Sequence, residues 1–409
     1  MNFFTDANNV KAKKVVVIPP LYNNSRTMEF LIRPEKDLFY PNEVFLHFNL
    51  KVPAAYIVDN QSAAKLFDSV EITLNGCKIT NRSCSNEYFL ASYFNIRSSY
   101  PTDIIETSMR PMGYYSIRSL DVTDIDALEA DTKAFYLKEQ SHYEIKEGGK
   151  VTFRVYNIIT PIMSPLFQQT KPLPPNMSIN VNFKRSNAEI PLLQVDTDSE
   201  STYANANIDI NDAYLECTYV EDGDLVNKYN FMTTKALKYH LEEPLIRTFT
   251  IDKGLSTATF NVNTGGKLPL VVFSALCKPE AFFGDLKLSA TNFTRHDLTG
   301  FQLMVDNSTL PGSKVTMSDE TFVEPYVSFL RNTKLYNNAL AGKTLKMGDY
   351  INGNFILSYD LTTVEQESGW LSLKYDFKDF LANKLMVIVF MQYEKEVVIN
   401  KDREVTVNN

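Results

Sequence analysis

The sequence predicts an all-β fold with two sandwich domains in tandem. Three observations lead to this fold class: apolar and polar residues alternate in short blocks, aromatic residues make up 12% of the chain, and one order of strands, turn and helix occurs twice. Alternation with a period of two is typical of strands with one buried face, and flat rings pack well on such a face. The 409 residues suit two domains of roughly 200 residues each.

The first half of the chain reads as a series of half-buried strands. Every second residue from Val44 to Val52 is apolar, whereas His47, Asn49 and Lys51 between them are polar. The same alternation recurs in three shorter blocks: Val70–Leu74, Val151–Val155 and Ile179–Phe183. We therefore expect the core of this half to lie between sheets.

The second half repeats the pattern. Alternation is found in four blocks: Ala213–Tyr219, Phe301–Val305, Phe355–Tyr359 and Leu371–Phe377. The segment Leu385–Phe390 is apolar on both faces, which is typical of a central strand covered on both sides.

Turn residues divide these strands. Asn75-Gly76 between two apolar runs predicts a tight hairpin, because both residues tolerate positive φ, and Asp306–Gly312 predicts a longer hairpin loop that contains Pro-Gly. Prolines in 161–175 and from Pro191 onward are excluded from central strands, and the second passage leads into the polar stretch 196–207. We place the domain boundary there. This gives an N-terminal arm over residues 1–20, a first domain over 21–200 and a second domain over 201–409.

One structural unit is predicted in each half. In the first, the strand Val70–Leu74, a turn and the return strand Lys78–Thr80 lead into a segment with aromatic residues at helical spacing, Asn86–Phe94. In the second, the strand Phe301–Val305, a turn and the return strand Lys314–Met317 lead into the segment 319–330. Gly-led strands at Gly149–Val151 and Gly348–Tyr350 follow, and then a strongly apolar closing strand.

A repeated unit of this kind predicts two tandem antiparallel eight-stranded jelly rolls, a double jelly roll with short inserted helices. The alternative is that any two β domains contain such units by chance. Tandem immunoglobulin-like domains fit less well, because neither half contains a Trp and a Cys pair in the expected arrangement and the sole tryptophan is Trp370.

Composition excludes several classes of protein. The formal charge of −8 and the pI near 5.3 argue against a chain that wraps nucleic acid over its whole surface. No apolar run reaches the length of about 18 residues that a membrane-spanning helix needs. The N-terminal residues show no secretory signal, so we expect synthesis in the cytoplasm. The four cysteines (Cys77, Cys84, Cys217 and Cys277) are sparse and lie among apolar neighbours, as expected of buried free thiols in a reducing compartment.

The segment Leu66–Gly76, followed by Ile79-Thr80-Asn81 and the aromatic helix, resembles the major capsid proteins of Polinton/Maverick elements and adintovirus-like viruses. Further matches lie in Gly265–Phe273, in Asn292-Phe293, in Leu303–Asp306 and in Leu310-Pro311, so the resemblance covers both halves in order. No single match is specific, whereas their ordered combination is. The segment 100–148 departs from the pattern and reads as an acidic, weakly periodic insertion in the first jelly roll.

The resemblance implies both a fold and a function. The family is similar in fold to adenovirus hexon and virophage capsid proteins, with two jelly rolls in each chain and three chains in a pseudo-hexagonal capsomer. It implies a homotrimer that assembles with neighbouring capsomers, penton proteins and minor capsid proteins into an icosahedral virion shell around double-stranded DNA. The location would be the virion capsid, with assembly in the host cytoplasm or nucleus.

Catalytic and metal-binding residues are not predicted, and no cofactor or small-molecule substrate is expected. A cupin-type metal centre needs converging histidines, whereas His47, His142, His240 and His296 are scattered along the chain. Cys77 and Cys84 lack the spacing of a zinc site, and neither a nucleophile elbow nor a phosphate-binding Gly-rich loop is present. A set of carboxylates lacks the pattern of a calcium loop and reads as a solvated acidic loop: Asp121, Asp124, Asp126, Glu129 and Asp131.

A small basic cluster stands out in the otherwise acidic sequence. Lys11, Lys13 and Lys14 precede the apolar run Val15–Ile18. We hypothesise weak contact of this arm with the genome or an internal membrane, because three positive charges add modest electrostatic attraction. A solubilising tail before the first strand explains the cluster equally well.

Two other functions compete with the capsid hypothesis. The first alternative is a receptor- or glycan-binding β-sandwich protein, which would need a concave aromatic and polar patch at one end of a sandwich and would be expected to be secreted. The second is a hydrolase on a β scaffold, because a spatial triad is invisible in a sequence.

Overall fold

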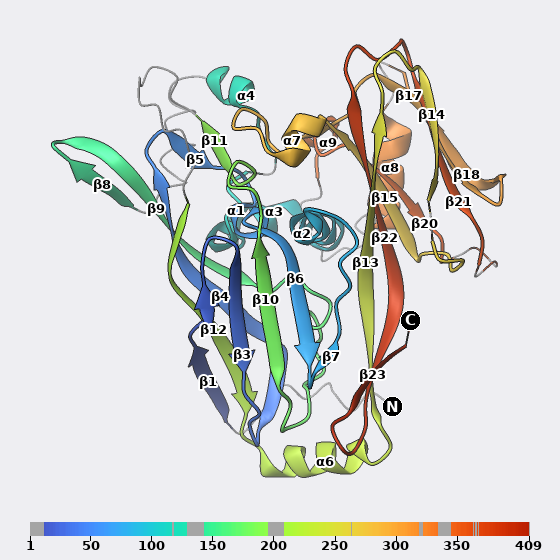
Figure 1. The fold of residues 1–409 in the computed structure, drawn as a ribbon. Helices are drawn as coiled ribbons and strands as arrows, with labels where there is room; N and C mark the ends of the chain where they lie inside the picture. The colour runs from blue at the N-terminus through green and yellow to red at the C-terminus, as the bar shows by residue number, and fades with distance from the viewer. Residues whose placement is uncertain are drawn as a thin grey trace.

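The computed structural model describes residues 12–116, 118–128, 143–194, 208–262, 264–318, 322–333, 345–362, 364, 366 and 368–408. Over these residues the chain folds into two β sandwiches that stand side by side, with short helices between them (Figure 1). None of the described helices is long and apolar enough to span a membrane.

The first sandwich consists of two antiparallel sheets of five strands each. One has the order β1-β12-β4-β9-β8 and the other the order β2-β3-β10-β6-β7. The strands are β1 (Lys13–Ile18), β2 (Tyr22–Asn23), β3 (Thr27–Ile32), β4 (Leu38–Pro53), β6 (Phe67–Leu74), β7 (Cys77–Lys78), β8 (Tyr143–Glu147), β9 (Lys150–Pro161), β10 (Ile179–Arg185) and β12 (Asp209–Val220). A short pair, β5 (Tyr56–Val58) with β11 (Leu192–Gln194), lies beside them.

The second sandwich has one sheet in the order β13-β22-β15-β20 and another in the order β14-β21-β17-β18. The strands are β13 (Leu237–Ile251), β14 (Thr257–Val262), β15 (Val271–Cys277), β17 (Leu298–Val305), β18 (Ser308–Thr316), β20 (Ile356–Asp360), β21 (Leu371–Phe377) and β22 (Leu385–Ile399). Strand β23 (Val405–Asn408) extends the first sheet by pairing with β22, and β16 (Phe293–Thr294) pairs with β19 (Asn352–Gly353).

Both sandwiches follow one wrapping pattern. If β1, β3, β4, β6, β7, β9, β10 and β12 are numbered one to eight, the two sheets of the first sandwich have the orders 1-8-3-6 and 2-7-4-5. The strands β13, β14, β15, β17, β18, β20, β21 and β22 give the same two orders in the second sandwich. This is the jelly-roll order, and it confirms the predicted all-β double jelly roll.

The described helices lie mainly in the connections of the two sandwiches. They are α1 (Ser62–Lys65), α2 (Glu87–Ser99), α3 (Thr102–Thr107), the 3-10 helix η2 (Arg110–Met112), α4 (Val122–Asp126), α6 (Gly223–Thr233), α7 (Pro279–Phe283), α8 (Val323–Asn332) and α9 (Met347–Ile351). Helix α2 connects the fifth and sixth main strands of the first sandwich, and α8 and α9 occupy the same connection in the second. The predicted strand, turn, strand and helix unit is therefore present twice.

Most predicted strands are found, and the alternation matches burial. The apolar residues of β4 from Val44 to Val52 are buried, with partly exposed residues between them. Strand β22 is buried throughout Leu385–Met391, as expected of a strand covered on both sides. A continuous core runs through both sandwiches.

Two local predictions in the second half are wrong. Residues Gly348–Tyr350 lie in helix α9 rather than in a strand, because Tyr350 packs against Phe329 of α8 and Phe355 instead of joining a sheet. The hairpin between β17 and β18 turns at Asp306-Asn307, both with positive φ, and the residues after it already belong to β18. Asp and Asn reach the left-handed conformation more readily than most residues, so the Pro-Gly sequence is not needed for the turn.

The change from one sandwich to the other lies later than residue 200. Strand β12 pairs with β1 and β4, so the block Ala213–Tyr219, which alternates as predicted, completes the first sandwich rather than opening the second. We place the change at Glu221-Asp222, before α6, whose N-terminus is capped by the Asp222 side chain. The proline-rich and polar passage after Pro191 marks a connection within the first sandwich. The predicted arm likewise contains β1, the first strand of the jelly-roll order.

The segment 100–148, which the sequence analysis describes as an insertion, contains α3, η2, α4 and β8. Residues 117 and 129–142 of this segment lie outside the described part. Helix α4 packs Val122 and Ile125 against Ile57 of β5 and Leu193 of β11. Its backbone is tied to the second sandwich, because Val122 N donates to Lys287 O at 2.9 Å. The insertion therefore helps to join the two sandwiches.

We expect Asn75→Ala to destabilise the protein by about 2 kcal/mol, because alanine disfavours the positive φ and loses two hydrogen bonds. The Asn75 side chain accepts from Ser178 N at 2.6 Å and donates to Arg403 O of the second sandwich at 2.9 Å. Denaturant unfolding measures the effect. Asn75→Gly is the matched control, since it keeps the backbone conformation and should cost less. Equal stability of Asn75→Ala and the wild type would contradict this account of the turn.

Candidate functional site

Helix α2 is buried on all sides at the junction of the two sandwiches (Figure 1). Its N-cap residue Asn86 has positive φ, its backbone N–H donates to Asp68 Oδ1 at 2.7 Å, and its side chain donates to Phe282 O of the second sandwich at 2.7 Å. A helix that is apolar around its whole circumference requires cover on every side. The first sandwich alone cannot supply that cover.

The aromatic residues of α2 divide between the two sandwiches. Tyr88 packs on Phe67 and Phe183 of the first, with ring centroids 6.2 and 6.3 Å apart. Phe94 packs on Phe273 and Phe390 of the second, at 6.0 and 5.2 Å. The junction is thus an extension of the hydrophobic core, and apolar burial of this kind is the main source of stability at such a contact.

A buried ion pair lies beside this helix. Lys65 Nζ is 2.5 Å from Asp59 Oδ2, and both side chains are almost completely buried. Ser289 of the second sandwich donates its hydroxyl to Asp59 Oδ2 at 2.7 Å, and its oxygen lies 3.1 Å from Lys65 Nζ. Burial lowers the pKa of Lys65, while the Asp59 carboxylate acts in the opposite direction. The pair fixes one geometry between the sandwiches, because either charge alone would be costly.

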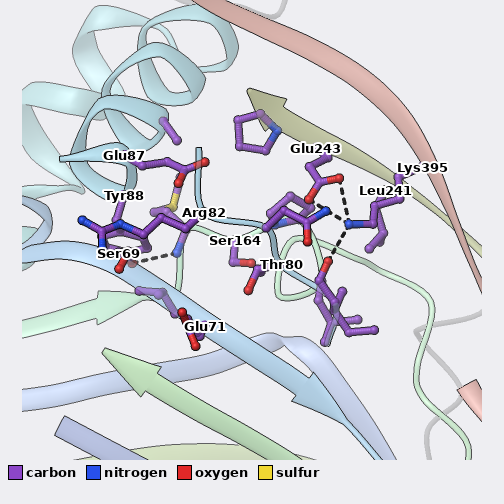
Figure 2. A pocket seen from close by; sticks show the side chains of 18 residues that line it. Ser69, Glu71, Thr80, Arg82, Glu87, Tyr88, Ser164, Leu241, Glu243 and Lys395 are labelled. Atoms are coloured by element: carbon purple, nitrogen blue, oxygen red, sulfur yellow. Dashed lines mark hydrogen bonds and ion pairs between the residues drawn. The ribbon is translucent and has the colours of Figure 1, made fainter. Parts of the chain in front are cut away.

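A second buried lysine reaches across the junction from the other side. Lys395 of β22 lies 2.8 Å from the Glu243 carboxylate and donates to Ile79 O of the first sandwich at 2.6 Å. Figure 2 shows these contacts at the end of a small pocket between α2, β6 and β13. The pocket has a volume of about 50 Å³, enough for water molecules. The arrangement joins the surfaces of the two sandwiches.

The residues weighed as possible ligands or nucleophiles do not converge. His47 of β4 stacks on Tyr214 with centroids 4.6 Å apart, His240 of β13 is exposed beside Glu394, and His142 lies outside the described residues. Within the described ranges, no group of three or more His, Cys, Asp or Glu side chains could hold a metal ion.

All four thiols are free, as predicted, but only Cys217 and Cys277 are buried, whereas Cys77 and Cys84 are partly exposed. Burial raises the pKa of Cys84 to about 12 and that of Cys217 to about 12. Burial also raises the pKa of Cys277 strongly. These three side chains are therefore protonated at neutral pH, which makes them poor nucleophiles and poor metal ligands.

The acidic segment is only partly solvated. Asp124 and Asp126 are exposed, whereas Asp121 is half buried and accepts from Ser289 N at 2.9 Å. Asp121 and Asp124 together form the capping box of α4. Glu129 and Asp131 lie outside the described residues. Asp121 and Asp124 thus have structural partners, which the sequence alone did not indicate.

Two lysines of the basic cluster also have partners. Lys13 Nζ lies 2.5 Å from Glu43, and Lys14 Nζ lies 3.7 Å from Glu35, while Lys11 lies outside the described residues. These exposed pairs reduce the positive charge that the start of β1 presents.

The comparisons with known proteins agree with the fold. No family model matches the chain. One curated relative, an uncharacterized protein of Caenorhabditis elegans, is 25% identical over 142 residues, which are 34% of this chain and 34% of that protein. The chain therefore matches about a third of the length of this relative.

Solved structures match nearly the whole chain. A structure of the Sputnik virophage superposes with a TM-score of 0.70 at 12% identity and covers 98% of this chain and 88% of that chain. The mavirus major capsid protein gives 0.56 at 10% identity, with 98% and 93% covered. The Faustovirus major capsid protein gives 0.56 at 9% identity, with 94% and 90% covered. The shared feature is the double jelly roll.

We expect Lys65→Met to destabilise the protein by about 3–5 kcal/mol, because it leaves the Asp59 carboxylate buried without its cation. Lys238→Met is the matched control: it removes an exposed lysine that lies 2.9 Å from Glu396, and it should cost less than about 1 kcal/mol. Chemical denaturation compares the two. Similar losses for both variants would show that the buried pair does not hold the junction.

His296 provides a test by pH. Burial, with the nearby Lys278, lowers the pKa of His296 to about 4 despite Asp297. Because this value is below the unfolded value of about 6.5, the unfolded chain binds the proton first. The stability from neutral His296 is fully present above pH 6.5 and is lost as the pH falls toward 4, by about 3 kcal/mol.

The matched variant is His296→Asn, since asparagine tolerates the positive φ of this position. Its free energy of unfolding should change less than that of the wild type between pH 6.5 and 4. Parallel pH profiles of the two proteins would refute the assignment.

Proposed function

We propose that the chain is a major capsid protein, a non-enzymatic subunit that trimerises into pseudo-hexameric capsomers and forms an icosahedral shell around double-stranded DNA. The observation that carries the proposal is the exact repetition of the jelly-roll order in both halves, over the whole described chain. The mavirus and Faustovirus proteins with this fold are major capsid proteins. Within this proposal, we assign the protein to the major capsid proteins of Polinton/Maverick elements, because Leu66–Gly76 and the later segments resemble theirs.

The rigid junction between the two sandwiches fits the role of a shell subunit. Two sandwiches fixed rigidly by α2 and by the Lys65–Asp59 pair present a constant shape, which a closed shell with many copies requires. Each contact between copies can be of ordinary size, because a shell contains many of them. The partners are then further copies of the chain, penton proteins and minor capsid proteins, and the location is the virion.

The basic cluster at the N-terminus adds one weak contact to the proposed function. Weak contact of Lys11, Lys13 and Lys14 with the genome or an internal membrane has to compete with Glu43 and Glu35. Replacing the three lysines with glutamine leaves the backbone of β1 intact. Unchanged genome content of the particles would reject the contact.

We expect the purified full-length chain to be a stable trimer. Its mass by light scattering should be three times 46.6 kDa, about 140 kDa, and electron microscopy at higher concentration should show sheets or shells. A monomer at all concentrations that binds glycans on an array would contradict the proposal and favour the receptor- or glycan-binding alternative.

A further inference from the structure

The buried pair of Asp59 and Lys65 has the geometry of two groups that can react with each other. Asp59 directly follows β5, and Lys65 is the last residue of α1, which lies beside α2 (Figure 1). Lys65 Nζ lies 2.5 Å from Asp59 Oδ2. The carboxyl carbon Cγ is one bond of about 1.2 Å from Oδ2, so Nζ lies no more than about 3.7 Å from Cγ. Reacting atoms in a near-attack geometry are about 3–3.5 Å apart, so only a small movement is required.

The pair is closed off from solvent. Asp59 and Lys65 are each 0% exposed, and Ser289 of the second sandwich is 1% exposed. Burial lowers the pKa of Lys65, although the Asp59 carboxylate acts in the opposite direction. Transfer of one proton from Nζ to Oδ2 removes both buried charges and leaves an amine beside a carboxylic acid. A lysine amine that is desolvated in this way is a nucleophile.

Each oxygen of the Asp59 carboxyl group has its own donor. Asn60 N donates to Oδ1 at 2.6 Å, and Ser289 Oγ donates to Oδ2 at 2.7 Å. When an amine attacks Cγ, negative charge develops on the oxygen that stays, and a fixed N–H donor stabilises it. Oδ1 is therefore the oxygen that stays, and Oδ2 is the oxygen that leaves.

The Asn60 donor is held in one position by residues of the 100–148 insertion. Asn60 Nδ2 donates to Ser116 O at 2.7 Å, and Asn60 Oδ1 accepts from Tyr115 N at 3.0 Å. The next residue, Gln61, has a φ of 65°, and its N–H donates to Gly113 O at 2.7 Å. A non-glycine residue in this left-handed conformation is strained, and such strain is concentrated at functional sites.

Ser289 provides a path for a second proton. Its oxygen lies 3.1 Å from Lys65 Nζ, while its hydroxyl donates to Asp59 Oδ2. The hydroxyl can therefore accept a proton from the nitrogen as it passes its own proton to the leaving oxygen. Ser289 N donates to Asp121 Oδ1 at 2.9 Å, and this contact holds the serine beside the pair.

We propose that Lys65 and Asp59 form an intramolecular amide, an isopeptide bond, in the folded chain. Lys65 Nζ bonds to Asp59 Cγ, and the bond between Cγ and Oδ2 breaks. The ammonium group loses two protons, one directly to Oδ2 and one through Ser289, and Oδ2 leaves as water. The step is redox-neutral and needs no co-reactant. The product leaves no charge buried at the site.

The bond forms only after the two sandwiches have packed together. Asp59 and Lys65 belong to the first sandwich, whereas Ser289 lies between β15 and β16 of the second. Packing both excludes water from the pair and delivers the serine hydroxyl. The amide then fixes the loop from β5 to α1, on which the second sandwich rests. This inference does not depend on the proposed function.

The other buried lysine of the junction serves as an internal control. Lys395 Nζ lies 2.8 Å from both oxygens of Glu243 and also donates to Ile79 O. The Glu243 side chain is 19% exposed, and contact with water stabilises its charged form. We expect this pair to remain ionic.

Mass spectrometry of a tryptic digest of the unfolded wild-type chain tests the bond. An amide on Lys65 blocks cleavage there, so we expect peptide 52–78, lighter by one water molecule than its sequence requires. Cleavage after Lys395 should be normal. Separate peptides 52–65 and 66–78 of full sequence mass would overturn the proposal.

A cyclic imide at Asp59 has lost one water molecule as well, and the same digest separates the two products. The imide leaves Lys65 open to trypsin, so the loss would lie on peptide 52–65. That result would also overturn the proposal.

Ser289→Ala tests the proton path, because it keeps both reacting groups. In a time course that begins at synthesis, the linked peptide should form about 100-fold more slowly than in the wild type. Ser274→Ala is the matched control: this serine is also 1% exposed, but it bonds to Tyr375, and the variant should react at the wild-type rate. Equal rates for Ser289→Ala and the wild type would overturn the role of Ser289. The wild-type digest decides whether the bond exists even if Ser289→Ala fails to fold.

Discussion

The packing of α2 between the two sandwiches is the interaction on which the rest of the structure depends. A helix with aromatic residues around its circumference is stable only where apolar surface meets it on every side, and here each sandwich supplies one side. The apolar core therefore continues from one sandwich into the other. Lys65 with Asp59, and Lys395 with Glu243, add directional contacts to this apolar joint, since each ion pair reaches an atom of the other sandwich.

The sequence predicted the fold because strand alternation and turn residues are local signals. The alternating residues of β4 and the Asn75-Gly76 turn were readable without any knowledge of their neighbours. Predictions were wrong where contacts between distant residues determine the local structure. Gly348–Tyr350 is helical because Tyr350 packs against Phe329 and Phe355, and no local pattern records those distant rings. The polar passage after Pro191 indicated a long connection, but it did not indicate which strands the connection joins. The block that forms β12 was therefore assigned to the second sandwich, whereas β12 pairs with β4 of the first.

The sequence predicted one component of the junction, helix α2, but not the contacts that the helix makes. Aromatic residues at helical spacing predicted α2, yet the sequence gives no indication that Phe94 meets Phe273 and Phe390, which are far away in the chain. No pattern in the sequence singled out Lys65 or Asp59, and their partner Ser289 is distant in the chain. A hint was available in the run 62–66, Ser-Ala-Ala-Lys-Leu, where a single lysine stands among small and apolar residues.

The central claim is that one wrapping pattern, used twice, makes a rigid tile for a closed shell. A cryo-electron microscopy reconstruction of the purified oligomer tests it most directly. The account predicts a ring of six sandwiches that is made of three copies. A particle with one copy, or with a number of copies other than three, would contradict it.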